Sequence, residues 1–145
     1  MSEYWRLENV TQEITYLNTV DGLFINSGLA ELLDVYTDDY LWEQQERYEF
    51  QFQKLVDDGI VTPMKELDFT KIIDYLRREI NRRIRELRPN YGGDYDTEGF
   101  YFIDGIDDEM PSDEEIGDLR ALYIAFLEMK YDMKPGDICL VISEG

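Results

Sequence analysis

Hydrophobic residues recur at intervals of three or four along the first part of the chain. Over residues 4–20 this spacing predicts an amphipathic helix. The apolar residues that carry the pattern are Trp5, Leu7, Val10, Ile14 and Leu17. Residues 22–35 predict a second, short helix, although residues 22–26 alternatively suit a strand.

Two longer helices are predicted in the middle of the chain. Thr37 suits an N-cap before two acids in a first turn, and Gly59 suits a C-terminal stop, so we expect a helix over 38–58. Its apolar stripe consists of Leu41, Tyr48, Phe52 and Leu55. The clearest helical pattern covers 68–88 and ends at Pro89. It is carried by Ile73, Leu76, Ile80, Ile84 and Leu87.

The last third combines strand and helix patterns. The residues of 100–103 and the apolar run 138–142 predict strands, and residues 134–137 predict a turn. Ser112 and Glu115 have the spacing of a capping box, which predicts a helix from Ser112 to about Asp132.

The pattern as a whole predicts an α+β fold. We expect a single helix-rich domain over residues 1–145, with about five helices and a small β-sheet near residues 99–104 and 138–143. A subdivision at the 89–97 loop, which is rich in Gly, Asn and Asp, is the alternative.

Charge is the most informative feature of the composition. The 145 residues include 33 acids, 14 bases and no His, for a net charge of −19. Residues 1–64 carry −10, residues 65–88 carry +3 and residues 89–145 carry −12. Because such a field repels phosphate, we expect no direct binding to nucleic acid or to anionic membranes. The aromatic fraction of 14% nevertheless indicates a folded chain.

Cysteine content and the terminus indicate a compartment. Cys139 is the only cysteine, so no internal disulfide forms, which favours a reducing environment. Residues 1–6 do not resemble a signal peptide, and no apolar run is long enough to span a membrane. We therefore expect a cytoplasmic protein, in the host cytoplasm if it is phage-encoded.

The chain lacks the residues that most enzyme mechanisms require. Without His there is no Ser-His-Asp machinery and no His-ligated zinc, and Cys139 lies in an apolar run that suits the core. Glu128 and Lys130 have an E-x-K spacing found in some nucleases, but residues two apart do not share a helix face. Residues 94–99 match only part of a calcium loop, since Gly105 stands where the bidentate Glu belongs. We expect a non-enzyme with no catalytic residue, no metal and no cofactor.

The acids between Asp94 and Asp118 form the main candidate surface. This stretch has 11 acids and no base, which suits a carboxylate surface that imitates phosphates or docks into a basic groove. The alternative is solubility together with favourable charge at a helix start. The candidate partner-binding residues here are Asp104, Asp107, Asp108, Glu109, Asp113, Glu114, Glu115 and Asp118.

A second acidic face is predicted on the 38–58 helix. Asp39, Glu43 and Glu46, with Asp57 further on, fall within a broad common sector. An ordinary solvated helix face is the alternative. Aromatic residues that would add contacts if exposed are Trp5, Tyr40, Trp42, Tyr91, Tyr95 and Tyr101.

The 68–88 helix carries a run of arginines. They are Arg77, Arg78, Arg82, Arg83, Arg85 and Arg88. Because the rest of the chain would repel phosphate, we interpret them as partners of acids on the same helix and across the fold. A homo-oligomer contact through this helix is a further possibility.

The profile of a small, acidic, aromatic-rich chain resembles, in composition alone, the inhibitors of nucleic-acid enzymes made by phages and mobile elements, including antirestriction and anti-CRISPR proteins. We therefore expect an acidic, DNA-mimic-like inhibitor whose partner is a nuclease or another basic nucleic-acid-binding protein. An immunity or antitoxin protein that neutralises a basic toxin is the alternative, and a structural component of a phage or larger complex is the third.

Overall fold

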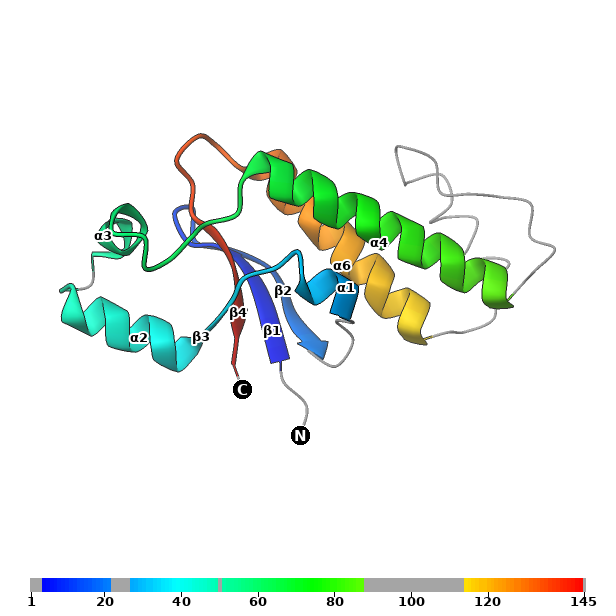
Figure 1. Ribbon diagram of the computed structural model, residues 1–145, viewed down its shortest axis with the longest axis horizontal. Helices are drawn as coiled ribbons and strands as arrows, with labels where there is room; N and C mark the ends of the chain where they lie inside the picture. The colour runs from blue at the N-terminus through cyan, green and yellow to red at the C-terminus, as the bar shows by residue number, and fades with distance from the viewer. Residues whose placement is uncertain (1–3, 22–26, 50, 88–113, 145) are drawn as a thin grey trace.

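A small mixed sheet with helices on both faces forms the centre of the fold (Figure 1). The computed structural model describes residues 4–21, 27–49, 51–87 and 114–144. The strands are β1 (Tyr4–Asn9), β2 (Ile14–Asp21), β3 (Val35–Thr37) and β4 (Cys139–Ser143), in the order β2-β1-β4-β3. The helices are α1 (Ser27–Ala30), α2 (Asp38–Arg47), α3 (Phe52–Asp57), α4 (Glu66–Leu87) and α6 (Glu114–Asp132). The α+β class is thus confirmed.

The number of helices is smaller than expected. Of the helices in the described ranges, α1 has only four residues, which is a single turn. Four longer helices remain there, not about five. The sheet is larger than expected on its N-terminal side, because β1 and β3 flank β4 and β2 extends the sheet beyond β1.

Strand β4 is buried on both faces. It pairs antiparallel with β1 and parallel with β3, and its five residues are all buried. Cys139 and Val141 belong to one hydrophobic cluster, and Leu140 and Ile142 belong to the other. This explains the uninterrupted apolar run, since a strand covered on both faces needs no polar alternation.

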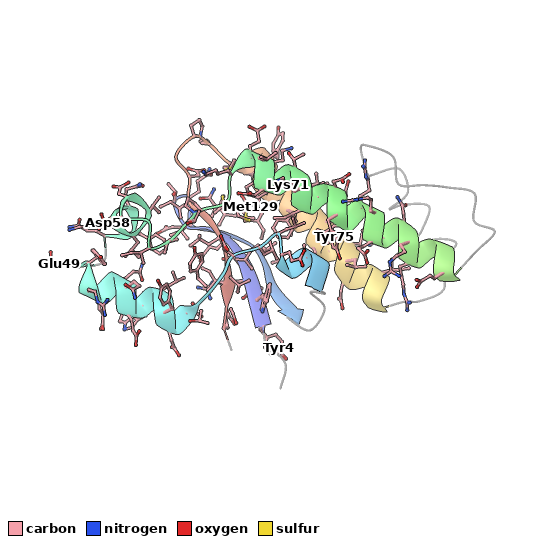
Figure 2. The ribbon with its side chains drawn as sticks, in the orientation of Figure 1. Tyr4, Glu49, Asp58, Lys71, Tyr75 and Met129 are labelled. Carbon is pink, nitrogen blue, oxygen red and sulfur yellow. The ribbon has the colours of Figure 1, made fainter. Side chains whose placement is uncertain are left out.

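The larger cluster lies between the sheet and helices α1, α4 and α6. Helices α4 and α6 run side by side in opposite directions, and Met129 of α6 points toward the sheet (Figures 1 and 2). Phe69 of α4 meets Phe126 of α6 edge to face, with ring centroids 6.4 Å apart. Trp5 and Leu7 close the cluster from β1.

The smaller cluster lies on the opposite face, under α2 and α3. Leu41 of α2 and Leu55 of α3 are buried against Leu140 and Ile142. Val61, after α3, completes it. These two short helices therefore form a second, thinner layer.

The helix predicted over 4–20 is wrong, because this segment is a β-hairpin. Strands β1 and β2 pair antiparallel around a turn at residues 10–13. Trp5 and Leu7 face the core, while Arg6 and Glu8 alternate with them and are only partly buried. The apolar spacing resembled a helix because the two strands contribute residues on either side of the turn. The two-residue alternation from Trp5 to Asn9 was the strand signal.

The helix predicted over 38–58 is interrupted. Helix α2 ends at Arg47 and α3 begins at Phe52, and Glu49 between them has a left-handed φ of 57°. The predicted stripe still faces the smaller cluster, with Leu41 and Leu55 buried. Residues 22–35 hold only the short α1 and the start of β3, and the strand alternative at 22–26 lies outside the described residues.

The later elements agree with the pattern where they are described. Helix α4 covers 66–87, α6 ends at Asp132 as expected, and β4 occupies the predicted 138–143 strand. Gly136, with a φ of 88°, turns the chain between α6 and β4. The 89–97 loop, the strand near 99–104 and the Ser112 cap lie outside the described residues.

Candidate interaction surface

Only part of the predicted acidic surface belongs to the described structure. Asp104, Asp107, Asp108, Glu109 and Asp113 lie outside it. Glu114 and Glu115 lie in the first turn of α6, and their side chains are not described. Asp118 is partly buried on α6 and already has an interaction partner. Whether these acids join those of α2 is therefore outside what the described residues show, except for Asp118, which lies on α6.

Helix α2 presents a compact acidic face. Asp39, Glu43 and Glu46 are exposed and, within the described ranges, form no ion pair. Trp42 lies among them and is 55% exposed. The four positions follow the i, i+3, i+4, i+7 spacing and fall within a sector of about 100°. Asp57, which was predicted to share this face, belongs to α3 and accepts a hydrogen bond from Gln53 Nε2 at 3.0 Å.

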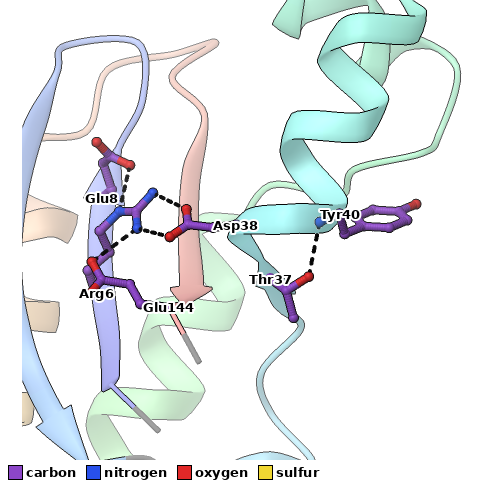
Figure 3. Close-up of polar contacts among 6 residues, drawn as sticks. All are labelled: Arg6, Glu8, Thr37, Asp38, Tyr40 and Glu144. Carbon is purple, nitrogen blue, oxygen red and sulfur yellow. Dashed lines mark hydrogen bonds and ion pairs between the residues drawn. The ribbon is translucent and has the colours of Figure 1, made fainter.

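The start of α2 is fixed by two sets of hydrogen bonds (Figure 3). Thr37 is the N-cap as predicted, and its Oγ1 accepts a hydrogen bond from the Tyr40 backbone N–H at 3.1 Å. Arg6 on β1 donates to both carboxylate oxygens of Asp38, at 2.7 and 2.9 Å. The same guanidinium also contacts Glu8 and Glu144. These carboxylates raise the pKa of Arg6, chiefly because Asp38 accepts its hydrogen bonds.

Two aromatic residues flank or support the acidic face. Tyr40 is 38% exposed, and its ring stacks on Tyr36 with centroids 6.2 Å apart. Tyr36 is held in turn, because its hydroxyl accepts a hydrogen bond from the Thr62 N–H at 2.9 Å. Trp5, named as an exposed candidate, is instead 9% exposed in the larger cluster. Tyr91, Tyr95 and Tyr101 lie outside the described residues.

The described arginines of α4 pair with acids on their own helix. Arg77 and Arg78 both contact Asp74, at 2.6 and 3.2 Å. Arg82 contacts Glu79 and Glu86, and Arg83 contacts Glu86. The same-helix pairing is confirmed for these residues.

The residues considered for catalysis, Cys139 and Lys130, take part in structural contacts. Cys139 is fully buried, and burial raises the pKa of its thiol to about 12, so it behaves as a core residue. Lys130 reaches across to α4 and donates to Thr70 Oγ1 at 3.4 Å, away from any joint site with Glu128. No group of three or more potential metal-ligating side chains occurs within the described ranges. Among the helices described there, none is long and apolar enough to cross a membrane.

A hollow of about 610 Å³ lies along the C-terminal half of α6. Its described lining is mostly apolar, and Tyr131 is 89% exposed. The lining side chains are Ile124, Leu127, Glu128, Lys130, Tyr131 and Asp132. The sequence pattern predicted a helix over this stretch but did not indicate its exposed apolar face.

Sequence reasoning also missed the place of Trp42 within the acidic face. Its position three residues after Asp39 and one before Glu43 was the available signal. The sequence matches no known protein family, and comparisons with curated proteins and with solved structures found no similar chain. The arrangement of side chains must therefore carry any functional argument.

Proposed function

We propose that this protein is a non-enzymatic, DNA-mimic-like inhibitor that occupies a basic, nucleic-acid-binding surface of another protein. The observation that supports this most is the α2 face, where Asp39, Glu43 and Glu46 surround the exposed Trp42 without an ion pair among the described residues. The net charge of −19 adds a long-range field that steers a basic partner toward the chain.

The spacing of the α2 carboxylates suits a phosphate-binding partner. Residues one helical turn apart are about 5–6 Å from each other. Phosphates along a nucleic-acid strand are spaced on a similar scale. A groove lined with Lys and Arg for phosphates can therefore accept these carboxylates at comparable positions.

Trp42 supplies what carboxylates alone lack. An exposed indole adds apolar contact area and accepts a guanidinium on its ring face. Tryptophan is also enriched among residues that dominate binding energy at interfaces. A partner that stacks bases beside its phosphate contacts offers a matching environment for this side chain.

The acidic stretch from Asp104 to Glu115 forms the other half of the proposal, on the strength of its sequence. We expect it to add carboxylates to the contact, as no base occurs between Asp94 and Asp118.

The first experiment identifies the partner and its salt dependence. The full chain is immobilised, incubated with a bacterial lysate at low salt and eluted with a salt gradient, and the eluate is read by mass spectrometry. We expect a nuclease or another nucleic-acid-binding protein to elute at moderate salt and to be displaced by DNA or RNA. Recovery of no nucleic-acid-binding protein contradicts the proposal.

The second experiment assigns the surface. A variant with Asp39→Lys, Glu43→Lys and Glu46→Lys is compared with a matched control, Glu13→Lys, Glu31→Lys and Asp34→Lys, which reverses three exposed acids elsewhere. We expect the α2 variant to lose far more affinity for the captured partner than the control. Equal losses would show that only net charge matters.

A third variant tests the acidic stretch from Asp104 to Glu115, which is proposed from its sequence. It carries Asp104→Lys, Asp107→Lys, Asp108→Lys and Glu109→Lys, and we expect it to bind more weakly than the wild type. Unchanged binding would remove this stretch from the contact.

A further inference from the structure

The outer face of α6 carries an apolar stripe that the described residues cover only in part. Ile124 and Leu127 are only partly buried, and Tyr131 is 89% exposed. With Arg120 they follow one another at steps of four, three and four residues, so all four fall within a sector of roughly 60°. The core of α6 faces elsewhere, through Phe126 and Met129.

The acidic surfaces of the chain would repel a second copy of itself. The net charge is −19, and the α2–α3 segment from Asp38 to Asp58 alone carries −5, from seven acids and two bases. The stretch from Leu119 to Asp132 is different, because Arg120 and Lys130 balance Glu128 and Asp132. Two copies can meet here without the repulsion that opposes contact through the acidic surfaces.

The stripe is also complementary to itself. In an antiparallel helix pair about a two-fold axis, a residue faces the one at the mirrored position. Placing the axis midway between Ile124 and Leu127 sets each of these against the other in the second copy. The same axis sets Arg120 against the exposed ring of Tyr131, where a guanidinium gains a cation–π contact.

The neighbouring edge of the sheet is less suited to the contact. Strand β2 is the edge beside β1, and its register shifts at two places along the pair. Such bulges twist an edge strand and interrupt its free hydrogen-bonding groups, which disfavours pairing with a further strand. The α6 face is therefore better suited to association than this edge strand.

We propose that this protein forms a two-fold homodimer through the α6 stripe of Arg120, Ile124, Leu127 and Tyr131, with the acidic α2 faces left open. The hollow beside the stripe is the space that the second copy's side chains fill. This inference stands whether or not the acidic face binds a nucleic-acid-binding protein.

Sedimentation velocity of the full chain over a range of concentrations tests the dimer. We expect dimerisation to strengthen as salt rises, because counterions screen the repulsion between two copies of charge −19. Binding to a basic partner weakens under the same change, so the two associations are distinguished by the sign of their salt dependence. A monomer at every concentration and salt level overturns the inference.

Substitution locates the interface. Tyr131→Glu adds a charge at a side chain that is 89% exposed, so it leaves the fold intact while weakening the dimer by about tenfold or more. Trp42→Glu is the matched control, since it makes a similar change at the exposed site on α2. We expect the control to dimerise like the wild type. A dimer that survives Tyr131→Glu, or that Trp42→Glu disrupts equally, contradicts the α6 interface.

The pair of variants also separates the two proposals. Tyr131→Glu should leave capture of a basic partner unchanged, and Trp42→Glu should weaken it. A dimer lost in Tyr131→Glu alone supports the α6 interface even if no basic partner is ever captured.

Discussion

Arg6 and Asp38 lie 32 positions apart in the chain and are joined by two parallel hydrogen bonds, from Nη2 to Oδ1 at 2.7 Å and from Nη1 to Oδ2 at 2.9 Å (Figure 3). The pair connects the third residue of β1 to the first residue of α2. Because α2 carries the exposed acids, this contact fixes the orientation of the proposed binding face relative to the sheet.

Asp38→Asn should lower the free energy of unfolding by about 1 kcal/mol, which is the upper range for an exposed pair with bidentate geometry. The Asp38 side chain is 46% exposed, so water screens part of the interaction. Glu144→Gln removes a single contact of 3.2 Å to the same guanidinium and should cost less than about 0.5 kcal/mol. Urea unfolding of both variants measures the difference. Equal losses would mean that the bidentate geometry of the Arg6–Asp38 pair adds nothing to the free energy of unfolding.

Replacing Gly28 or Gly117 with Ala should have opposite effects on the stability of the fold. A Cβ at Gly28 on α1 would lie 2.7 Å from Tyr75 Oη and 2.9 Å from Tyr75 Cε2 on α4, so Gly28→Ala should destabilise the fold by about 1–2 kcal/mol. A Cβ at Gly117 on α6 would meet no described atom beyond its chain neighbours and its own helix backbone within 4 Å. Gly117→Ala should therefore stabilise by about 0.5–1 kcal/mol through its helix propensity. Thermal unfolding of the two variants compares the signs, and destabilisation by both would contradict the α1–α4 contact.

The elements that could be predicted from sequence are those with a single, long periodic pattern. Helix α4 repeats its apolar residues over six turns, so its bounds followed from the sequence. The β1–β2 hairpin could not be predicted in the same way, because apolar residues from two strands mimic a helical spacing when the turn at 10–13 is overlooked. Glu49 interrupts the 38–58 helix without a Gly or Pro to mark the break.

The candidate surface could be predicted only in part. Local spacing along one helix can be seen in the sequence, but contacts between distant segments cannot. Asp39, Glu43 and Glu46 lie on one helix, so local spacing brought them together. The contact of Arg6 with Asp38 depends on strand pairing far along the chain, which local pattern does not encode. The exposed stripe on α6 could not be anticipated either, since its apolar residues are the kind that usually lie in a core.

Replacing Glu13 with Asn should stabilise the fold. It has a left-handed φ of 57° in the hairpin turn between β1 and β2, a conformation that Asn adopts more readily than Glu. Glu13→Asn should raise the free energy of unfolding by about 0.5 kcal/mol. Glu13→Gln is the control, because it removes the same charge without relieving the backbone. If both substitutions stabilise equally, the gain comes from lost charge repulsion, and the backbone argument is wrong.

Asp137 should contribute stability that is lost in acid. Its carboxylate accepts hydrogen bonds from Asn9 Nδ2 at 2.9 Å, from the Lys134 N–H at 2.9 Å and from Gln12 Nε2 at 2.5 Å, which tie the turn before β4 to the β1–β2 hairpin. These hydrogen bonds, that of Asn9 first, lower the pKa of Asp137 below its ordinary value of 3.8. Because the folded protein holds the carboxylate ionised more strongly than the unfolded chain does, its contribution is complete above about pH 4.

As the pH falls through the lowered pKa of Asp137, the folded state must take up a proton and this contribution is lost. Carboxyl NMR titration should place the Asp137 midpoint below 3.8 in the wild type. Asn9→Ala removes the hydrogen bond that lowers the pKa of Asp137 most, so it should move that midpoint upward while flattening the loss of stability below about pH 4. A midpoint unchanged by Asn9→Ala would show that the hairpin contact does not hold the Asp137 charge, and that the acid sensitivity of the fold arises at other carboxylates.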